Sequence, residues 1–404
     1  MTPDEVRAAA TELHVLHQRF APLFGYAPAQ DHALTYLRGL LLHDGRKNVE
    51  AIALRFGDGQ VRPLQEFLAA APWDSRLLQQ EIQAVFAESL VPSTTGWSIG
   101  TVGVFDESAH PKKGDHSAGV ARQWCGRLGK KDNCQVGVYL VGVTPAGCAL
   151  LEQQLYLTED WILDKARRDE TGIPRSVTFR TKPEIALDLH ARVQAAGHVR
   201  LDWLTFDEGY GRDGDFLAAL EQRHQLYVGE VPITTTVWTE DPSTQVPAYT
   251  GRGRRPVRPA RDSVRTVQEV GAALPQEAWR VLCLRAGACA PVVFEFAAVR
   301  VWAMRNQQPG PPIWLLWRRS VGGQGEVKYS VSNAGTDTPL EVLALVSSCR
   351  VRVEEYFEDS KGYLGMGHYE CRSWAGWHHH MTLVALAHLL VTRVRQRLQK
   401  KRAG

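Results

Sequence analysis

Cysteine is scarce in this sequence, and its arrangement excludes two common kinds of site. The 404 residues contain seven cysteines, an odd number, and no two of them form a C-x-x-C pair. A zinc ribbon needs such pairs, and a disulfide framework needs paired cysteines, so we expect neither. The cysteines are therefore expected to be buried thiols of a protein that works in a reducing compartment.

Long apolar runs and a large excess of charge are also absent. No apolar stretch is long enough to cross a bilayer, and the first residues, M-T-P-D-E-V-R, lack the pattern of a signal peptide. We therefore expect a cytoplasmic protein without a membrane partner. The formal net charge is only +3, so an acidic partner has to be inferred from where the cations cluster and not from their total.

Residues 1–90 have the pattern of a small helical domain. Amphipathic segments such as D-H-A-L-T-Y-L-R-G-L-L are bounded by Pro, Gly or Asp. Arg46, Lys47 and Asn48 precede the third helical segment, where cations and backbone amides could meet a phosphate. We expect a DNA-binding domain here, and a plain helical bundle is the alternative.

Residues 91–235 change to β-branched runs of period two. The runs S-I-G-T-V-G-V-F-D-E-S, N-C-Q-V-G-V-Y-L-V-G-V and C-A-L-L-E-Q-Q-L-Y-L predict an antiparallel meander. Helix and strand patterns then alternate as far as L-Y-V-G-E-V. This order of elements is typical of an α/β, ribonuclease H-like fold, a mixed sheet with flanking helices.

Residues 236–338 have the pattern of a β-rich insertion. It begins with a basic loop at 251–265, which has six Arg against one Asp and is interrupted by Gly and Pro. Strand-like segments such as V-V-F-E-F-A-A-V-R-V-W-A-M follow. Residues 339–404 then return to helical patterns, complete the predicted core and end in a basic tail.

A single closing helix is predicted from Leu340 to Lys361, because this run contains no Pro or Gly and its apolar residues recur at helical spacing. At about 100° per residue, Arg350, Glu354 and Lys361 fall on one stripe of that helix. Such a pattern is usually a solvated row of ion pairs. The alternative is a carboxylate that binds a metal ion between two cations that hold phosphates.

Two further carboxylates lie at predicted strand ends. Asp106 ends the first strand and Asp207 ends the fourth, and we expect these strands to be neighbours at the centre of the sheet. With Glu354 they would form a set of oxygen ligands that suits two Mg²⁺ or Mn²⁺ ions, about 4 Å apart, for phosphodiester chemistry. Three adjacent carboxylates are the alternative ligands: Glu107, Glu208 and Glu355.

These segments together resemble a bacterial insertion-sequence transposase of the DDE type, in the ribonuclease H-like superfamily, from the branch with a Tyr-Arg-Glu-Lys signature on the closing helix. The resemblance lies in F-D-E-S-A-H-P-K-K-G-D, in L-T-F-D-E-G-Y-G and in R-V-R-V-E-E-Y-F-E-D-S-K-G-Y-L-G-M-G-H. It implies a metal-dependent, nucleoid-associated enzyme that cleaves double-stranded transposon-end DNA and joins the 3′ ends to target DNA as a homodimer. The alternatives are a domesticated transposase that serves as a DNA-binding regulator or architectural protein, and an immobile nuclease.

The resemblance also implies roles for single residues. Asp106, Asp207 and Glu354 would be the catalytic metal ligands, while Arg350 and Lys361 would contact DNA phosphates. The signature Tyr belongs three residues before the Arg, and that position is Ser347 here. A hydroxyl is therefore kept at this position, but the aromatic ring is not.

Clustered cations supply the other candidates for DNA binding, because Lys and Arg side chains neutralise phosphates. The glycine-rich segment after the first strand contains Lys112, Lys113, Arg122, Arg127, Lys130 and Lys131. The basic loop contains Arg254, Arg255 and Arg258, and the tail adds further cations.

Aromatic and histidine residues near the end of the chain complete the candidates. In related transposases an aromatic residue of the insertion can stack on an extruded base, for which the candidates here are Trp302, Trp314 and Trp317. A Trp in a strand is more often a core residue. The run 378–380, His-His-His, cannot bind one metal ion, because adjacent helical residues diverge by about 100°. We expect it to be a solvated or DNA-facing patch.

Overall fold

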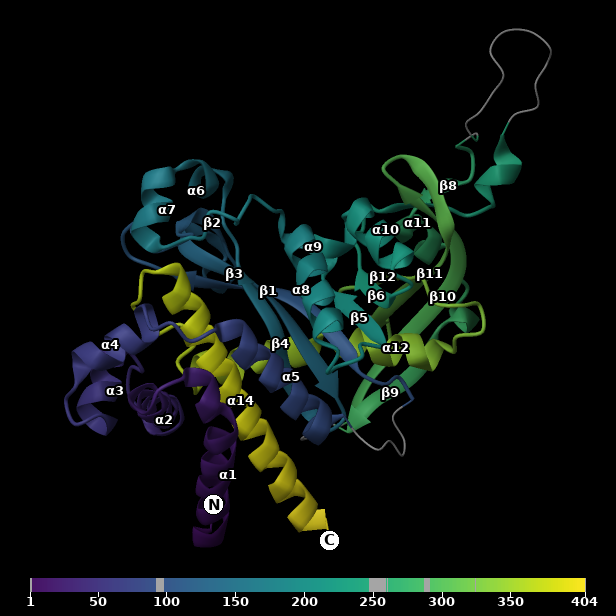
Figure 1. Cartoon of the computed structure of the whole chain (residues 1–404). Helices are drawn as coiled ribbons and strands as arrows, with labels where there is room; N and C mark the ends of the chain where they lie inside the picture. The colour runs from purple at the N-terminus through teal and green to yellow at the C-terminus, as the bar shows by residue number, and fades with distance from the viewer. Residues whose placement is uncertain are drawn as a thin grey trace. The chain divides into compact units, whose positions relative to one another are not determined.

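The computed structural model describes residues 2–91, 98–246, 259, 261–286, 291–323 and 325–403. The chain forms two compact units, whose elements are labelled in Figure 1. Unit 1 consists of residues 1–97, 104–200 and 351–404, and unit 2 consists of residues 98–103 and 201–350. Both units combine sheet strands with flanking helices, so the predicted mixed α/β fold is confirmed.

The N-terminal part of unit 1 is helical, as predicted. Its helices are α1 (Pro3–Phe20), α2 (Ala27–Leu42), α3 (Val49–Phe56), α4 (Val61–Ala69) and α5 (Ser75–Leu90). Polar residues begin several of them: Thr2 forms a capping box with Glu5, and the side chains of Asn48 and Asp74 accept backbone hydrogen bonds. Helices α1, α2, α4 and α5 pack on α14 (Trp374–Ala403), which is yellow in Figure 1, and α3 packs on α2 and α4.

The strands of unit 1 form an antiparallel arrangement around β3. These strands are β1 (Val102–Pro111), β2 (Ala121–Cys125), β3 (Lys130–Thr144) and β4 (Gly147–Leu155). β3 pairs with β2 and β4 and lies next to β1. The predicted meander of β1, β3 and β4 is confirmed, and β2 is a strand that the sequence pattern did not predict.

Helices cover both faces of these strands. On one face lies α8 (Lys182–Ala196), which begins with a capping box between Thr181 and Glu184; α6 (Glu159–Leu163) and α7 (Lys165–Thr171) precede it. α13 (Val351–Gly362) and α14 contact the β4 region. Within the residues that the structure describes, no helix is both long and apolar enough to span a membrane.

Unit 2 is built on a second run of strands. β5 (Trp203–Phe206) and β6 (Leu226–Glu230) are parallel, and the order continues from β6 through β12 (Lys328–Ser332), β11 (Gln308–Ser320), β10 (Pro291–Arg305) and β7 (Thr236–Trp238) to β8 (Val264–Thr266). β9 (Arg280–Ala286) pairs with residues 291–296 of β10, whereas β7 pairs with residues 302–303. The helices of this unit are α9 (Glu208–Gly211), α10 (Gly214–Gln222), α11 (Val267–Ala272) and α12 (Leu340–Ser348). The predicted β-rich insertion is thus present, and its strands extend the sheet from β6.

The prediction of one continuous closing helix is wrong, because α12 ends at Ser348 and α13 begins at Val351. The hydroxyls of Ser347 and Ser348 donate to carbonyls three residues earlier, at 3.0 and 2.7 Å. The amide of Cys349 also bonds three residues back, at 3.0 Å, and not four. These local bonds tighten the turn and compete with the helical pattern, so the helix stops without Pro or Gly.

Candidate functional site

Asp106 and Glu107 are neighbours on β1, but they face opposite sides of the sheet, because side chains alternate along a strand. The Glu107 carboxylate forms an ion pair with Lys182 at the start of α8. His110, which shares the face of Asp106, is hydrogen-bonded to the Tyr139 hydroxyl at 3.0 Å, and the Tyr139 ring packs on α13. Asp106 therefore lies on the side of the sheet that carries α13.

Lys361 connects α13 to this position. Its side chain is half-buried, and burial lowers its pKa; the Arg127 charge lowers it further, while the Asp106 charge opposes both effects. The ammonium lies 5.2 Å from the centre of the Phe357 ring. An aspartate and a lysine from separate elements of unit 1 thus lie within electrostatic range of each other.

Glu354 lies on the same stripe of α13 as Phe357 and Lys361, since offsets of three and seven residues return to nearly the same direction on a helix. Its side chain is exposed. Glu355 points about 100° away and forms an ion pair with Arg352 at 2.7 Å. The two carboxylates are therefore distinct: Glu355 is held by a cation of its own helix, and Glu354 shares the stripe of the lysine near Asp106.

Asp207 follows β5 in unit 2 and begins the short helix α9. Its Oδ1 accepts a hydrogen bond from the Gly209 amide at 2.9 Å, which fixes the carboxylate as a helix cap. A Cβ at Gly209 would lie 3.0 Å from that oxygen, so a glycine suits this close approach. The alternative ligand Glu208 lies 3.5 Å from Arg212 and is exposed.

The helix break removes Arg350 from the predicted stripe. Arg350 is the last residue of unit 2, and its guanidinium lies 3.5 Å from the Glu230 carboxylate at the end of β6. Arg318 approaches the same carboxylate at 3.9 Å. The prediction that Arg350 continues the helical face of Glu354 is therefore wrong, and Arg350 belongs to a charged group around Glu230 within unit 2.

The hairpin of β2 and β3 presents exposed cations. Lys113, Arg122, Arg127 and Lys131 are all exposed, and in the part of the chain that the structure describes none of them forms an ion pair. Trp124 lies opposite Lys131 in the strand register, two residues from Arg122, and 59% of its surface is exposed. One face of the hairpin therefore carries an accessible indole between two unpaired cations.

Two cations of the predicted cluster have partners within the protein: the half-buried Lys112 and the exposed Lys130. The Lys112 ammonium donates to the Tyr369 carbonyl at 2.7 Å and lies 3.2 Å from the centre of the Tyr369 ring. Burial lowers the pKa of Lys112 to about 8. Lys130 pairs with Asp132 at 3.2 Å. The prediction that Lys112 is a surface contact is wrong, because its charge is used to hold the segment around Tyr369.

Comparison with known proteins now identifies the family. Residues 19–289 match the model of a family described as DDE superfamily endonuclease. The chain belongs to this superfamily. The matched residues include Asp106 and Asp207 and end before Glu354.

Two known transposases are similar to parts of this chain. A probable transposase for insertion sequence element IS701 from Microchaete diplosiphon is 28% identical over 184 residues, which are 45% of this chain and 44% of the relative. The cryo-EM structure of a piggyBac transposase synaptic complex with hairpin DNA overlays on 92% of this chain and 66% of that chain, with 8% identity and a TM-score of 0.41. The match therefore spans less than half of the curated relative. The family model and the curated relative confirm the predicted resemblance to an insertion-sequence DDE transposase.

The donor set of this DDE endonuclease fits the metal ions predicted for it. Asp106, Asp207 and Glu354 offer only carboxylate oxygens, the ligand type that Mg²⁺ and Mn²⁺ prefer. Asp106 and Glu354 belong to unit 1 and Asp207 belongs to unit 2. Among the described residues, no cluster of three or more His, Cys, Asp or Glu side chains has the geometry of a metal site.

The three tryptophans predicted as stacking candidates differ in exposure. Trp317 is 1% exposed, and its indole N–H donates to the Val267 carbonyl at 3.1 Å. A ring buried to this extent has no free face, so the prediction for Trp317 is wrong. Trp302 and Trp314 are half-buried, and Arg300 lies 5.3 Å from the centre of the Trp314 ring. They stay predictions, while the predicted contacts Arg254, Arg255 and Arg258 lie outside the described residues.

The histidine run at 378–380 is a structural feature of α14. His379 is hydrogen-bonded to the carbonyl of Trp73 at 3.0 Å and stacks on its ring at 3.7 Å. His380 is fully buried, and its Nδ1 is hydrogen-bonded to the Tyr36 hydroxyl at 2.8 Å. The prediction of a solvated or DNA-facing patch is wrong for His379 and His380, which are buried, whereas His378 is half-buried.

One exposed residue was missed by the sequence reasoning. Trp124 lies in the segment A-R-Q-W-C of β2, where polar and apolar residues do not alternate, so the local pattern carried no signal for a strand with an outward indole. Aromatic rings next to cations are typical of surfaces that bind unpaired or distorted nucleic acid. We therefore add Trp124 to the candidates for DNA contact.

Proposed function

We propose that this DDE endonuclease is an insertion-sequence transposase that cleaves DNA at transposon ends and joins the 3′ ends to target DNA. The observation that carries the proposal is the orientation of Asp106, which faces α13, lies near Lys361 and shares that side with the stripe of Glu354. Asp106 of β1 thus faces the helix that carries the Glu354 carboxylate and the Lys361 ammonium. In a chain of this superfamily, that arrangement fits the cleavage and formation of phosphodiester bonds.

We propose that Asp106, Asp207 and Glu354 bind two divalent ions, Mg²⁺ or Mn²⁺. When bound, such ions supply Lewis-acid stabilisation of the charge that develops on phosphate oxygens. The chain's own residues orient the ligands: the Glu107 amide donates to Asp106 at 2.7 Å, and the Gly209 amide donates to Asp207 at 2.9 Å. Lys361 then binds a phosphate beside Asp106.

DNA binding in this proposal uses the face of the β2–β3 hairpin together with the N-terminal helices. The unpaired cations of the hairpin neutralise phosphates, which supplies affinity without sequence preference. Arg350 contributes a phosphate contact when it leaves Glu230, and two copies of the chain act on a pair of transposon ends. The partner is therefore double-stranded DNA, bound by a homodimer.

The test compares neighbouring carboxylates in a cleavage assay with labelled end DNA and Mg²⁺. Asp106→Asn and Glu354→Gln should each lower the cleavage rate by roughly 100-fold or more, because each removes charge that the transition state requires. Glu107→Gln and Glu355→Gln are the matched controls and should retain cleavage, since those carboxylates pair with Lys182 and Arg352.

Two results would count against the proposal. Near-normal cleavage by Asp106→Asn, with loss of cleavage in Glu107→Gln, would transfer the metal-binding role to the neighbour. Tight binding of end DNA by the unmodified protein, without any cleavage in the presence of Mg²⁺ or Mn²⁺, would indicate a DNA-binding regulator instead.

A further inference from the structure

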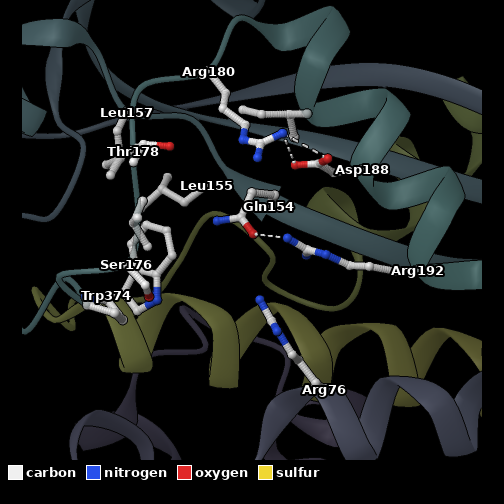
Figure 2. A pocket seen from close by; sticks show the side chains of 13 residues that line it. Arg76, Gln154, Leu155, Leu157, Ser176, Thr178, Arg180, Asp188, Arg192 and Trp374 are labelled. Carbon is white, nitrogen blue, oxygen red and sulfur yellow. Dashed lines mark hydrogen bonds and ion pairs between the residues drawn. The ribbon is translucent and has the colours of Figure 1, made fainter. Parts of the chain in front are cut away.

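A pocket of about 240 Å³ opens in unit 1, away from Asp106, on the side of α8. Figure 2 shows its walls: α5 contributes Arg76, β4 contributes Gln154, α8 contributes Arg192, and the start of α14 contributes Trp374. A second pocket of about 520 Å³ shares these four residues. The two together are here called the arginine pocket.

Three guanidinium groups line the arginine pocket. Arg180 is paired with Asp188 at 2.8 Å, and Arg192 donates to Gln154 at 3.1 Å. Within the described residues, the side chain of Arg76 has no ion-pair partner, and in Figure 2 it points from α5 toward Arg192. Two like charges that face each other across a pocket repel, and an anion placed between them removes this repulsion.

Burial and the neighbouring cations act in the same direction on Arg192. Burial lowers its pKa, the charges of Arg76 and Arg180 add to this effect, and Glu152 and Asp188 oppose it. Glu152 is itself 5% exposed and lies 3.8 Å from Arg192. Asp74 also lines the larger part of the pocket, so three carboxylates lie near the three guanidinium groups. Burial raises the pKa of Glu152 to about 7, so its negative charge is incomplete at neutral pH.

Two buried hydrogen-bond acceptors beside the pocket have no partner in the described chain. Gln79 and Gln153 are 2% and 5% exposed, and the side-chain oxygen of each lacks a partner although its amide nitrogen is bonded. Both residues line the larger part of the arginine pocket. Both oxygens are themselves buried, so they lie behind the surface that a ligand in the pocket would contact.

The arginine pocket also contains an aromatic side chain. Trp374 is half-buried at the first turn of α14, and its ring lies 4.4 Å from that of His378. A flat apolar ring at the mouth of a cationic pocket is suited to a nucleobase, which stacks on indole rings whatever its sequence. A base within a duplex cannot enter, because its faces and its pairing edge are already occupied.

We propose that the arginine pocket binds one unpaired nucleotide of the DNA substrate, with its phosphate between Arg76 and Arg192 and its base against Trp374. The proposal rests on the proposed function, since a DNA enzyme that opens strand ends produces such nucleotides. Its role is to capture a frayed or cleaved end and keep it from pairing again.

The experiment measures DNA binding by the full-length protein without divalent ions, so that it does not depend on the metal site. A fluorescent duplex with a short single-stranded 5′ overhang is compared with the blunt duplex and with an overhang made of abasic nucleotides. The unmodified protein should prefer the overhang by about 10-fold, and the abasic overhang should lose most of that preference.

Two variants separate the phosphate from the base. Arg76→Gln should lower the affinity for both overhang duplexes by about 10-fold and leave the blunt duplex unchanged. Trp374→Ala should lower only the affinity for the overhang that carries bases, and Trp374→Phe should restore part of it. Arg223→Gln, at an exposed arginine that follows α10 and lies outside the pocket, is the matched control and should change nothing.

Three results would overturn the proposal. The first is that the unmodified protein does not prefer the overhang duplex. The second is that Arg76→Gln loses affinity equally for blunt and overhang duplexes. The third is that a free deoxynucleoside monophosphate at equal concentration fully displaces the overhang duplex. Since cleavage at Asp106 is measured separately with Mg²⁺, a failure of the arginine pocket leaves that result intact. Conversely, a failure of the cleavage test leaves the binding test valid, because binding is measured without divalent ions.

Discussion

Adjacent acidic residues contact different partners in this protein, because the backbone directs their side chains to different sides of the strand or helix. On β1, Glu107 pairs with Lys182 while Asp106 faces α13. On α13, Glu355 pairs with Arg352 while Glu354 stays on the stripe of Lys361. Helix periodicity separated Glu354 from Glu355 in the sequence, whereas Asp106 was preferred to Glu107 only through the family resemblance. Which of these carboxylates bind metal ions stays a prediction.

Glu152 gives a test of burial at the level of one residue. It is 5% exposed, and burial raises its pKa to about 7, which Arg192 only partly opposes. Its pKa in the unfolded chain is lower, so the folded state keeps the proton and loses stability as the pH rises from about 4 to about 7. Glu152→Gln should therefore raise the free energy of unfolding by roughly 2 kcal/mol at about pH 8 and change it little at about pH 5.

Urea unfolding of both proteins at the two pH values measures this effect. Glu277→Gln, at an exposed carboxylate, is the control and should give no pH-dependent difference. A gain of equal size at both pH values would show that packing, and not ionisation, is responsible.

At the scale of elements, the β2–β3 hairpin shows where sequence reasoning falls short. The clustered cations were visible in the sequence, but which of them are free depends on contacts with distant residues. Lys112 is held by Tyr369, more than 250 positions away. The register that places Trp124 opposite Lys131 also arises from strand pairing and not from the local sequence.

The hairpin face predicts separable effects of charge and aromatic contact on DNA binding. Replacing Arg122 and Lys131 together by Gln should reduce the slope of log affinity against log salt by about 2, since each lost phosphate contact removes about 1. Trp124→Ala should weaken binding about 10-fold without changing that slope. Fluorescence anisotropy across a series of salt concentrations measures both quantities.

Leu163, another exposed apolar residue of unit 1, supplies the control for the tryptophan. Leu163→Ala should leave affinity and slope unchanged. If Trp124→Ala behaves in the same way, the indole does not contact DNA.

The break between α12 and α13 was not predictable from helix breakers, because the run contains neither Pro nor Gly. It arises from hydroxyl groups that bond to the backbone of their own helix. Ser347 occupies the position of the signature tyrosine and is one of these residues. The residue that departs from the family pattern thus takes part in ending α12.

At the scale of the whole molecule, composition and periodicity predicted the fold class, the helical N-terminal part, the meander and the β-rich insertion. These features depend on local pattern, which a single sequence contains. The burial of α14 was harder to predict, since its histidines read as polar residues. Their satisfaction by Tyr36 and Trp73 requires contacts across more than 300 positions.

Buried histidines predict that the whole protein loses stability in acid. Burial lowers the pKa of His380 to about 3 and that of His388 to about 4. Both are neutral in the folded state and take up protons on unfolding below about pH 6.5, so stability falls as the pH decreases. At about pH 5 each should cost roughly 2 kcal/mol relative to neutral pH, measured by urea unfolding.

Replacing one of the two buried histidines measures its contribution to the loss of stability in acid. His388→Gln should reduce the acid-dependent loss, whereas His116→Gln, at an exposed histidine, should leave it unchanged. An identical loss in His388→Gln would assign the acid sensitivity to other groups.

The two units are interleaved along the chain, since unit 1 is built from three segments and unit 2 from two. No single cut can release either unit whole. Truncation after residue 200 leaves unit 1 without α13 and α14. A fragment that begins at residue 201 lacks residues 98–103 and therefore loses the hydrogen bond of 2.9 Å from the Asp202 amide to the Thr101 carbonyl. Terminal deletions would therefore remove structure from the remaining piece. A separately expressed unit 2 would need residues 98–103 joined to residue 201 by a designed linker.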